Sequence, residues 1–146
     1  MIEIGTYSTC DKESVIALVL HCQNDGTRPL VGVEDQSDLL HIEEEYIYDG
    51  GNFWVAKENG KVAIGLMNKG NGLCILKKFF VYEPYRGKPH NLGQQLYGVF
   101  LEFAKLHGFS RIILDTPKNT DRAHLFYEKA GFRRIEKEEL PVEYDY

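Results

Sequence analysis

The spacing of hydrophobic residues in the first part of the chain predicts a short strand followed by a helix. Ile2-Glu3-Ile4 alternates, as a half-buried strand does. Ser8 and Asp11 then have the spacing of a capping box, which marks the start of a helix. The apolar residues that follow at helical spacing are Val15, Leu18, Val19 and Cys22. We expect this helix to end between His21 and Asn24, where turn-forming residues begin.

A second helix and three consecutive antiparallel strands are predicted next. The helix, from about Ser37 to Ile47, is indicated by apolar residues at positions 39, 40, 42, 46 and 47. Two apolar runs, Phe53–Ala56 and Val62–Ile64, flank Asn59-Gly60, the dipeptide that type I′ hairpin turns favour. A further turn rich in Gly and Asn leads into the third strand, Leu73–Val81.

The second half of the chain alternates helices with short strands. A long helix ending at Gly108 presents one apolar face, which consists of Leu92, Leu96, Val99, Phe100 and Phe103. A buried strand is predicted at Arg111–Leu114. Another helix has Asp121 in its first turn and Gly131 just past its end. With a last strand at Arg133–Ile135, the order of elements predicts a mixed α/β sheet.

Composition excludes several classes of protein. The chain has 146 residues, which predicts a single domain covering residues 1–146. Hydrophobic residues at 43% and charged residues at 27% are in ordinary globular proportions, which argues against disorder. The net charge of -5 argues against a nucleic-acid-binding protein, because such proteins carry a basic surface.

The cysteines, histidines and hydropathy favour a cytoplasmic protein. Cys10, Cys22 and Cys74 are odd in number and form no CxxC pair, so we expect buried reduced thiols rather than disulfides or a zinc site. The histidines show no ligand spacing, so no metal is expected. The N-terminal residues do not resemble a secretory signal. The longest aliphatic run, Val15–Leu20, is too short to cross a membrane, so no membrane partner is expected.

The segment with the most distinctive chemistry is Val81–Gly93, between the third of these strands and the long helix. A loop there directs backbone N–H groups to the positive end of a helix dipole, an arrangement that binds phosphate. Arg86 and Lys88 add positive charge to a chain that is acidic overall. The same residues also fit a solvated basic turn, and spacing alone leaves both interpretations open. The segment contains neither the GxGxxG fingerprint nor a P-loop.

Two motifs resemble those of the GNAT N-acetyltransferase superfamily. They are Tyr85-Arg86-Gly87, before the long helix, and Ala123–Phe132, in the last helix. The resemblance extends over most of the chain and implies an α/β (α+β) fold, with a mixed, mostly antiparallel central sheet flanked by helices in the order βααβββαβαβ. It also implies transfer of the acetyl group of acetyl-CoA to an amine. Segments 33–39, 51–56 and 131–141 are similar to bacterial GNAT proteins of unassigned substrate.

The resemblance assigns the cofactor contacts residue by residue. The family's pyrophosphate loop, [RQ]-x-x-G-x-[GA], matches residues 88–93, with Lys88 in place of Arg or Gln and Asn91 in place of the first Gly. Asn suits that position because it adopts left-handed backbone more readily than other non-glycine residues. The residues expected to contact acetyl-CoA are Phe80, Val81, Arg86, Gly87, Lys88, Asn91, Leu92, Gly93 and Asn119. Phe80 and Val81 are expected to offer backbone groups to the pantetheine arm.

The resemblance also implies that Tyr127 is the general acid that protonates the departing CoA thiolate. A phenol suits this role, because its ordinary pKa near 10 keeps it protonated until a basic sulfur forms. The helical spacing equally allows Tyr127 to be a core aromatic residue beside Phe126. The general base stays open between Glu83, Asp115 and water.

Other functions fit the same sequence. A larger acyl-CoA is a second possible donor. The chain also fits a non-catalytic acyl-CoA-binding or protein-interaction module, which the substitutions at Lys88 and Asn91 favour and the Tyr127 motif opposes. The family resemblance implies a small-molecule or peptide amine as acceptor and either a monomer or a homodimer.

Overall fold

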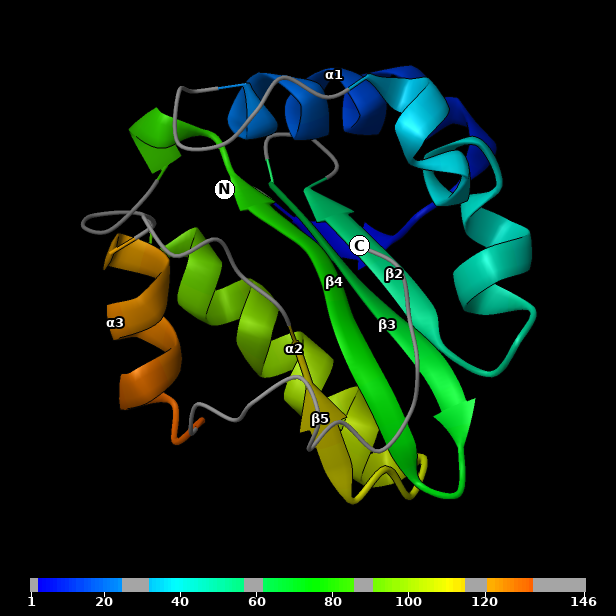
Figure 1. Ribbon diagram of the computed structural model, residues 1–146, viewed down its shortest axis with the longest axis vertical. Helices are drawn as coiled ribbons and strands as arrows, with labels where there is room; N and C mark the ends of the chain where they lie inside the picture. Colours follow the sequence, from blue (N-terminus) through cyan, green and yellow to red (C-terminus); the bar gives the residue numbers. More distant parts are fainter. Residues whose placement is uncertain (1–2, 25–31, 57–61, 86–90, 115–120, 133–146) are drawn as a thin grey trace. The chain divides into compact units, whose positions relative to one another are not determined.

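The computed structural model describes residues 3–24, 32–56, 62–85, 91–114 and 121–132 (Figure 1). Contacts within the chain divide it into two compact units, Met1–Leu114 and Asp115–Tyr146, and each is described by itself. The helices and strands of the first unit are β1 (Ile4–Thr6), α1 (Lys12–Gln23), β2 (Asn52–Ala56), β3 (Val62–Gly70), β4 (Leu73–Val81), α2 (Leu92–Leu106) and β5 (Arg111–Ile113). The second unit contains α3 (Asp121–Lys129).

The five strands form one sheet in the order β1-β2-β3-β4-β5. The first four strands pair antiparallel with their neighbours in sequence. Short connections join β2 to β3 and β3 to β4, whereas α1 and the segment 33–47 lie between β1 and β2. β5 pairs parallel with β4, after a crossover through α2. This mixed, mostly antiparallel sheet confirms the fold expected from the sequence. The strand expected at 133–135 lies outside the described residues.

Side chains that alternate along β2 pack against different layers. Trp54 packs edge-on against Phe103 of α2, with ring centroids 5.2 Å apart. Phe53 points to the opposite face, where its ring contacts those of Tyr7 and Tyr46 at 5.8 and 5.1 Å. Cross-strand pairing continues the face toward α2 through Ile64, Leu66 and Leu76. The core therefore has two halves, one on each side of the sheet.

The prediction of one continuous helix from Ser37 to Ile47 is wrong. The segment contains a 3₁₀ turn, η3 (Ser37–Leu40), and a π-helical turn, η4 (Glu43–Ile47). His41 separates them, with φ -136° and ψ 48°, which no α-helix accommodates. The wide turn, closed by the Tyr48 N–H donating to the Glu43 carbonyl at 2.8 Å, accompanies complete burial of Tyr46. A further 3₁₀ turn, η2 (Val33–Asp35), precedes η3.

The turn between β3 and β4 has the geometry that the sequence analysis assigned to Asn59-Gly60. Asn71 and Gly72 have φ values of 53° and 77°, and Gly70 pairs with Leu73 across them. Two successive positive φ values define the type I′ turn that Asn-Gly favours. Asn59-Gly60 itself lies outside the described residues, although the strands on either side of it pair as expected.

Most of the remaining boundaries agree with the sequence analysis. The Asp11 carboxylate accepts a hydrogen bond from the Ser8 N–H at 3.0 Å, as a capping box requires, although a 3₁₀ turn, η1 (Thr9–Asp11), precedes α1. The first strand begins two residues later than expected, at Ile4. Gly108 follows α2 with φ 78°, in the left-handed conformation that ends helices.

The cysteines follow expectation at two of three positions. Cys22 and Cys74 are buried, and burial raises the pKa of Cys74 to about 12. Cys10 is exposed, because it lies in η1 on the surface before α1, so the expectation of a buried thiol is wrong there. Within the described ranges, no helix combines the length and the apolar character that a bilayer crossing needs.

We predict that Gly65→Ala lowers the free energy of unfolding by about 1–3 kcal/mol, as overpacking of a core does. A Cβ at Gly65 would lie 2.7 Å from Cε1 of Tyr46 and 2.8 Å from Cδ2 of Phe53, so an aromatic ring must move. Urea unfolding followed by circular dichroism measures the change.

Gly98→Ala is the matched control for this prediction. Among the described residues, a Cβ at Gly98 meets no atom within 4 Å outside its own helix backbone and neighbours. Alanine is favoured over glycine within a helix by about 0.5–1 kcal/mol, so this variant is expected to be slightly more stable than wild type. A Gly65→Ala protein with unchanged stability would contradict the tight packing of the two rings.

Candidate functional site

The first turn of α2 lies against the end of β4. Leu92 is buried there, and Gly93 is so close to the strand that a Cβ on it would lie 3.6 Å from Cγ2 of Val81 and 3.9 Å from Cζ of Phe79. The structure therefore places three residues of the expected cofactor site, Val81, Leu92 and Gly93, side by side. Phe80 lies between Phe79 and Val81 on the same strand.

Asn91 precedes the first residue of α2 in a left-handed conformation, with φ 49° and ψ 35°. The backbone geometry is the one for which glycine is the usual residue, so the substitution of Asn for Gly keeps the local fold. The Asn91 carbonyl accepts the Gln95 N–H at 3.1 Å, and its side chain makes no capping hydrogen bond. An α-helix offers its first four N–H groups no acceptor of its own, so this end can bind an anion.

β4 contains one residue more than β3 at its centre. Ala63 pairs with Phe80 and Gly65 with Lys77, so Ile64 faces both Lys78 and Phe79. Lys78 has a φ of 55°. This arrangement is a β-bulge whose first residue is left-handed, a place where glycine is usual and a lysine is strained.

The bulge changes which side chains of β4 face α2. Leu76 faces α2, and Phe79, three residues later, also does, because its ring stacks on that of Tyr97 at 6.5 Å. In a regular strand, residues three apart point to opposite faces. The extra residue therefore determines which side chains of the last stretch of β4, including Val81, face the start of α2. Burial raises the pKa of Tyr97, so its hydroxyl stays protonated at neutral pH.

Side chains from α1 contact the end of β4 from the other side. The Cys22 thiol lies 3.9 Å from the Val81 carbonyl oxygen, as a weak donor. Nε2 of His21 lies 3.2 and 3.1 Å from the two carboxylate oxygens of Glu83, and both side chains are about half exposed. Glu83, one candidate for the general base, is thus paired with His21. Asp115, the other, lies outside the described residues.

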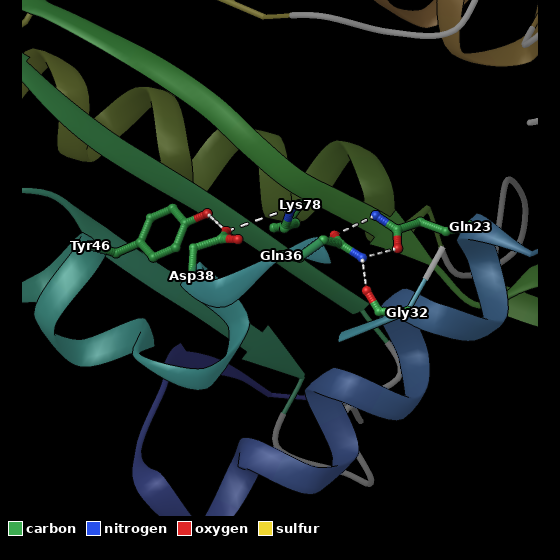
Figure 2. A network of polar contacts seen from close by, with 6 residues as sticks. All are labelled: Gln23, Gly32, Gln36, Asp38, Tyr46 and Lys78. Carbon is green, nitrogen blue, oxygen red and sulfur yellow. Dashed lines mark hydrogen bonds and ion pairs between the residues drawn. The ribbon is translucent and has the colours of Figure 1, made fainter. Parts of the chain in front are cut away.

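A buried polar network connects β4 with the segment from η2 to η4 (Figure 2). The Tyr46 hydroxyl donates to Oδ2 of Asp38 at 2.6 Å, and Nζ of Lys78 lies 3.6 Å from the same oxygen. Burial, followed by the nearby charge of Asp38, raises the pKa of Tyr46 well above its ordinary value.

Two glutamine side chains secure the same segment against α1. The amides of Gln23 and Gln36 donate to each other at 2.7 and 2.6 Å, and both side chains are buried (Figure 2). Lys78 was not among the residues that the sequence led us to expect at the site. The sequence feature that could have indicated the bulge is Lys77-Lys78, because two successive charged residues within an apolar strand break the expected alternation.

Tyr127 lies in the second unit, at the end of α3. The Phe132 N–H donates to the Tyr127 carbonyl at 3.0 Å, and the Gly131 N–H donates to the Glu128 carbonyl at 3.1 Å. With Gly131 at φ 98°, these bonds form a Schellman motif. The ring of Tyr127 also contacts those of Phe126 and Phe132, both at 5.6 Å. Tyr127 therefore has a structural role in ending the helix, whatever its hydroxyl does.

Several residues of the expected site are not among those that the structure describes. They are Arg86, Gly87, Lys88 and Asn119. Their assignment to the cofactor stays a prediction. Among the described residues, no group of three or more His, Cys, Asp or Glu side chains could hold a metal ion.

Comparison with known sequences gives one family. Residues 17–132 match the sequence model of the acetyltransferase (GNAT) family. N-acetylaspartate synthetase from Xenopus tropicalis is 34% identical over 105 residues, which cover 68% of this chain and 38% of that protein. This chain therefore spans well under half the length of that relative.

Solved structures of two bacterial acetyltransferases are similar over almost the entire chain. The acetyltransferase from Streptococcus agalactiae 2603 has a TM-score of 0.94 and 37% identity, covering 99% of this chain and 91% of that one. The GNAT-family acetyltransferase from Staphylococcus aureus MU50 has a TM-score of 0.90 and 32% identity, covering 97% and 89%. The sheet, the bulged β4 and the start of α2 thus occur in a chain that belongs to the GNAT family of N-acetyltransferases.

Proposed function

We propose that this chain transfers the acetyl group of acetyl-CoA directly to a primary amine, with Tyr127 as the general acid. The observation that carries the proposal is the left-handed Asn91 at the start of α2, directly beside the end of β4. This is the position that the family resemblance assigns to the pyrophosphate of acetyl-CoA. Helix N–H groups and the helix dipole favour a phosphate there.

The reaction needs a neutral amine, a bound thioester and a proton for the leaving group. The amine nitrogen attacks the thioester carbonyl carbon, so that a C–N bond forms and the C–S bond breaks. The Tyr127 hydroxyl gives its proton to the CoA sulfur, and the proton lost by the amine passes to water and restores the phenol. The balanced products are an N-acetylated amine and free CoA.

The acceptor is a primary amine whose identity is open. Relatives named N-acetylaspartate synthetase support including aspartate in a panel of small amines. Polyamines, aminoglycosides and amino-acid amides complete a panel that differs in charge around the amine. Release of CoA thiol from acetyl-CoA measures turnover with each. A chain that binds CoA and acetylates none of them would favour the non-catalytic acyl-CoA-binding module.

We predict that CoA raises the melting temperature of the wild-type protein and that Asn91→Gly binds CoA at least as tightly. A ligand at 100 times its Kd adds about 2.7 kcal/mol of stability. Glycine removes the strain of φ 49° and a side chain at the position where the family resemblance places the pyrophosphate. A thermal scan and a calorimetric titration with CoA measure both effects.

Asn71→Gly is the matched control, because Asn71 also has a positive φ, 53°, but lies in the turn between β3 and β4. It is expected to change stability without changing the affinity for CoA. Absence of any thermal shift with CoA would overturn the cofactor assignment. A large loss of affinity in Asn91→Gly would show instead that the Asn91 side chain makes a needed contact.

We predict that Tyr127→Phe lowers kcat about 100- to 10,000-fold, the usual contribution of a general acid, while the affinity for CoA is nearly unchanged. The phenylalanine ring keeps the contacts with Phe126 and Phe132, and the backbone bonds of the Schellman motif do not involve the hydroxyl. Steady-state kinetics with the best amine of the panel measures kcat.

Tyr48→Phe serves as the control for removing a phenol hydroxyl, because Tyr48 is 70% exposed on the first unit. Its kcat is expected to equal that of the wild type. Near-normal turnover in Tyr127→Phe, with the chemical step limiting the rate, would reduce Tyr127 to its role in ending α3.

A further inference from the structure

Lys78 combines two features that are unfavourable separately. Its backbone is left-handed at the bulge of β4, and its side chain is only 5% exposed. A lysine in this conformation is strained, and a buried ammonium group loses its hydration. Such a residue persists only where its surroundings hold it in place, so the contacts of its side chain decide whether the bulge forms at this position.

Asp38 supplies that contact from η3. Its carboxylate oxygen Oδ2 receives the Tyr46 hydroxyl at 2.6 Å and lies 3.6 Å from Nζ of Lys78, and its side chain is 12% exposed. Tyr46 is fully buried, so the donor that orients the carboxylate cannot move away. One oxygen atom thus joins η3, η4 and β4 (Figure 2).

Gln36, two residues before Asp38, anchors this part of the chain to α1. Gln36 exchanges two amide hydrogen bonds with Gln23 of α1, and its Nε2 also lies 3.5 Å from the Gly32 carbonyl oxygen. The two bonds between Gln23 and Gln36 are buried, and the contact with Gly32 is partly buried (Figure 2). Two groups of polar contacts, which the backbone of residues 36–38 connects, therefore lie between α1 and the centre of β4 (Figure 2).

We propose that Asp38 is a positioning residue for acetyl transfer, because it holds Lys78 in the bulge that directs the end of β4 toward the start of α2. This inference rests on the proposed function. Without the bulge, the alternation of β4 would turn Phe79 and Val81 away from α2, and the backbone of Phe80 and Val81, which is expected to contact the pantetheine arm of acetyl-CoA, would shift. A displacement of about 1 Å at a reacting group costs up to about 100-fold in rate.

The test separates the backbone effect of Lys78 from the charge of its side chain. Two double variants, Lys78→Met with Asp38→Asn and Lys78→Gly with Asp38→Asn, both remove the ion pair and leave no buried charge. They differ in that glycine adopts a left-handed bulge without strain, whereas methionine does not. Calorimetric titration with CoA, which has no acetyl group, and melting temperatures accompany kcat for every variant.

We predict that Asp38→Asn and the methionine double variant each lower kcat about 10- to 100-fold. The affinity for CoA, which also contains the pantetheine arm, is expected to fall by a smaller factor, because the start of α2 keeps its N–H groups. The glycine double variant is expected to recover most of the loss. Tyr46→Phe, which keeps the ring and removes only the hydroxyl, is expected to lower kcat in the same direction by a smaller factor. Lys69→Met, at an exposed lysine near the end of β3, is the control and is expected to leave kcat unchanged.

Three results would overturn the proposal. Asp38→Asn with wild-type kcat and a lower melting temperature would show that the network serves stability alone. Equal losses in the two double variants would show that the Lys78 ammonium acts directly rather than through the backbone. If the wild type acetylates no amine, the amide NMR signals of Phe80 and Val81 are measured in place of kcat. Identical signals in Asp38→Asn and wild type are the third result, and they would contradict the proposal independently of the proposed function.

Discussion

The left-handed backbone of Lys78 determines how the rest of β4 faces the core, since one extra residue reverses the alternation of every residue after it. Leu76 and Phe79 both face α2 as a result, and Val81 lies against Gly93 at the start of that helix. The bulge sits between Ala63 and Gly65 on the paired strand. The same strand thus builds the core with its first half and approaches the helix terminus with its second half.

The start of α2 and the end of β4 contribute different kinds of group to this place. The helix offers N–H groups and a positive dipole, which suit a phosphate, while the strand offers backbone groups that suit an extended chain. Asn91 begins the helix with a left-handed residue, and Leu92 fastens the first turn in the core. A GNAT chain that lacks the usual glycine therefore keeps the local geometry, at a cost in backbone strain.

The polar contacts between Lys78 of β4 and Asp38 of η3 are buried, although apolar side chains packed there would be about as stable. Buried ion pairs contribute little net stability, because desolvation opposes their attraction, and their best-supported use is to select one arrangement over another. The contact between Lys78 and Asp38 fits that use, since a regular strand and a bulged strand would expose different faces. Tyr127 also combines two roles. Its backbone carbonyl accepts a hydrogen bond of the Schellman motif that ends α3, and its hydroxyl is the proposed general acid.

The sequence by itself determined the elements whose signals are local. The capping box at Ser8, the apolar face of α2, the left-handed ends at Gly108 and Gly131, and the antiparallel strand run all follow from spacing within a few residues. Only the tertiary structure decided the break at His41, the bulge at Lys78 and the meeting of Asp38 with β4, because contacts between segments distant in sequence override local periodicity there. Helical spacing across 37–47 could not reveal the wider turn that accompanies the burial of Tyr46.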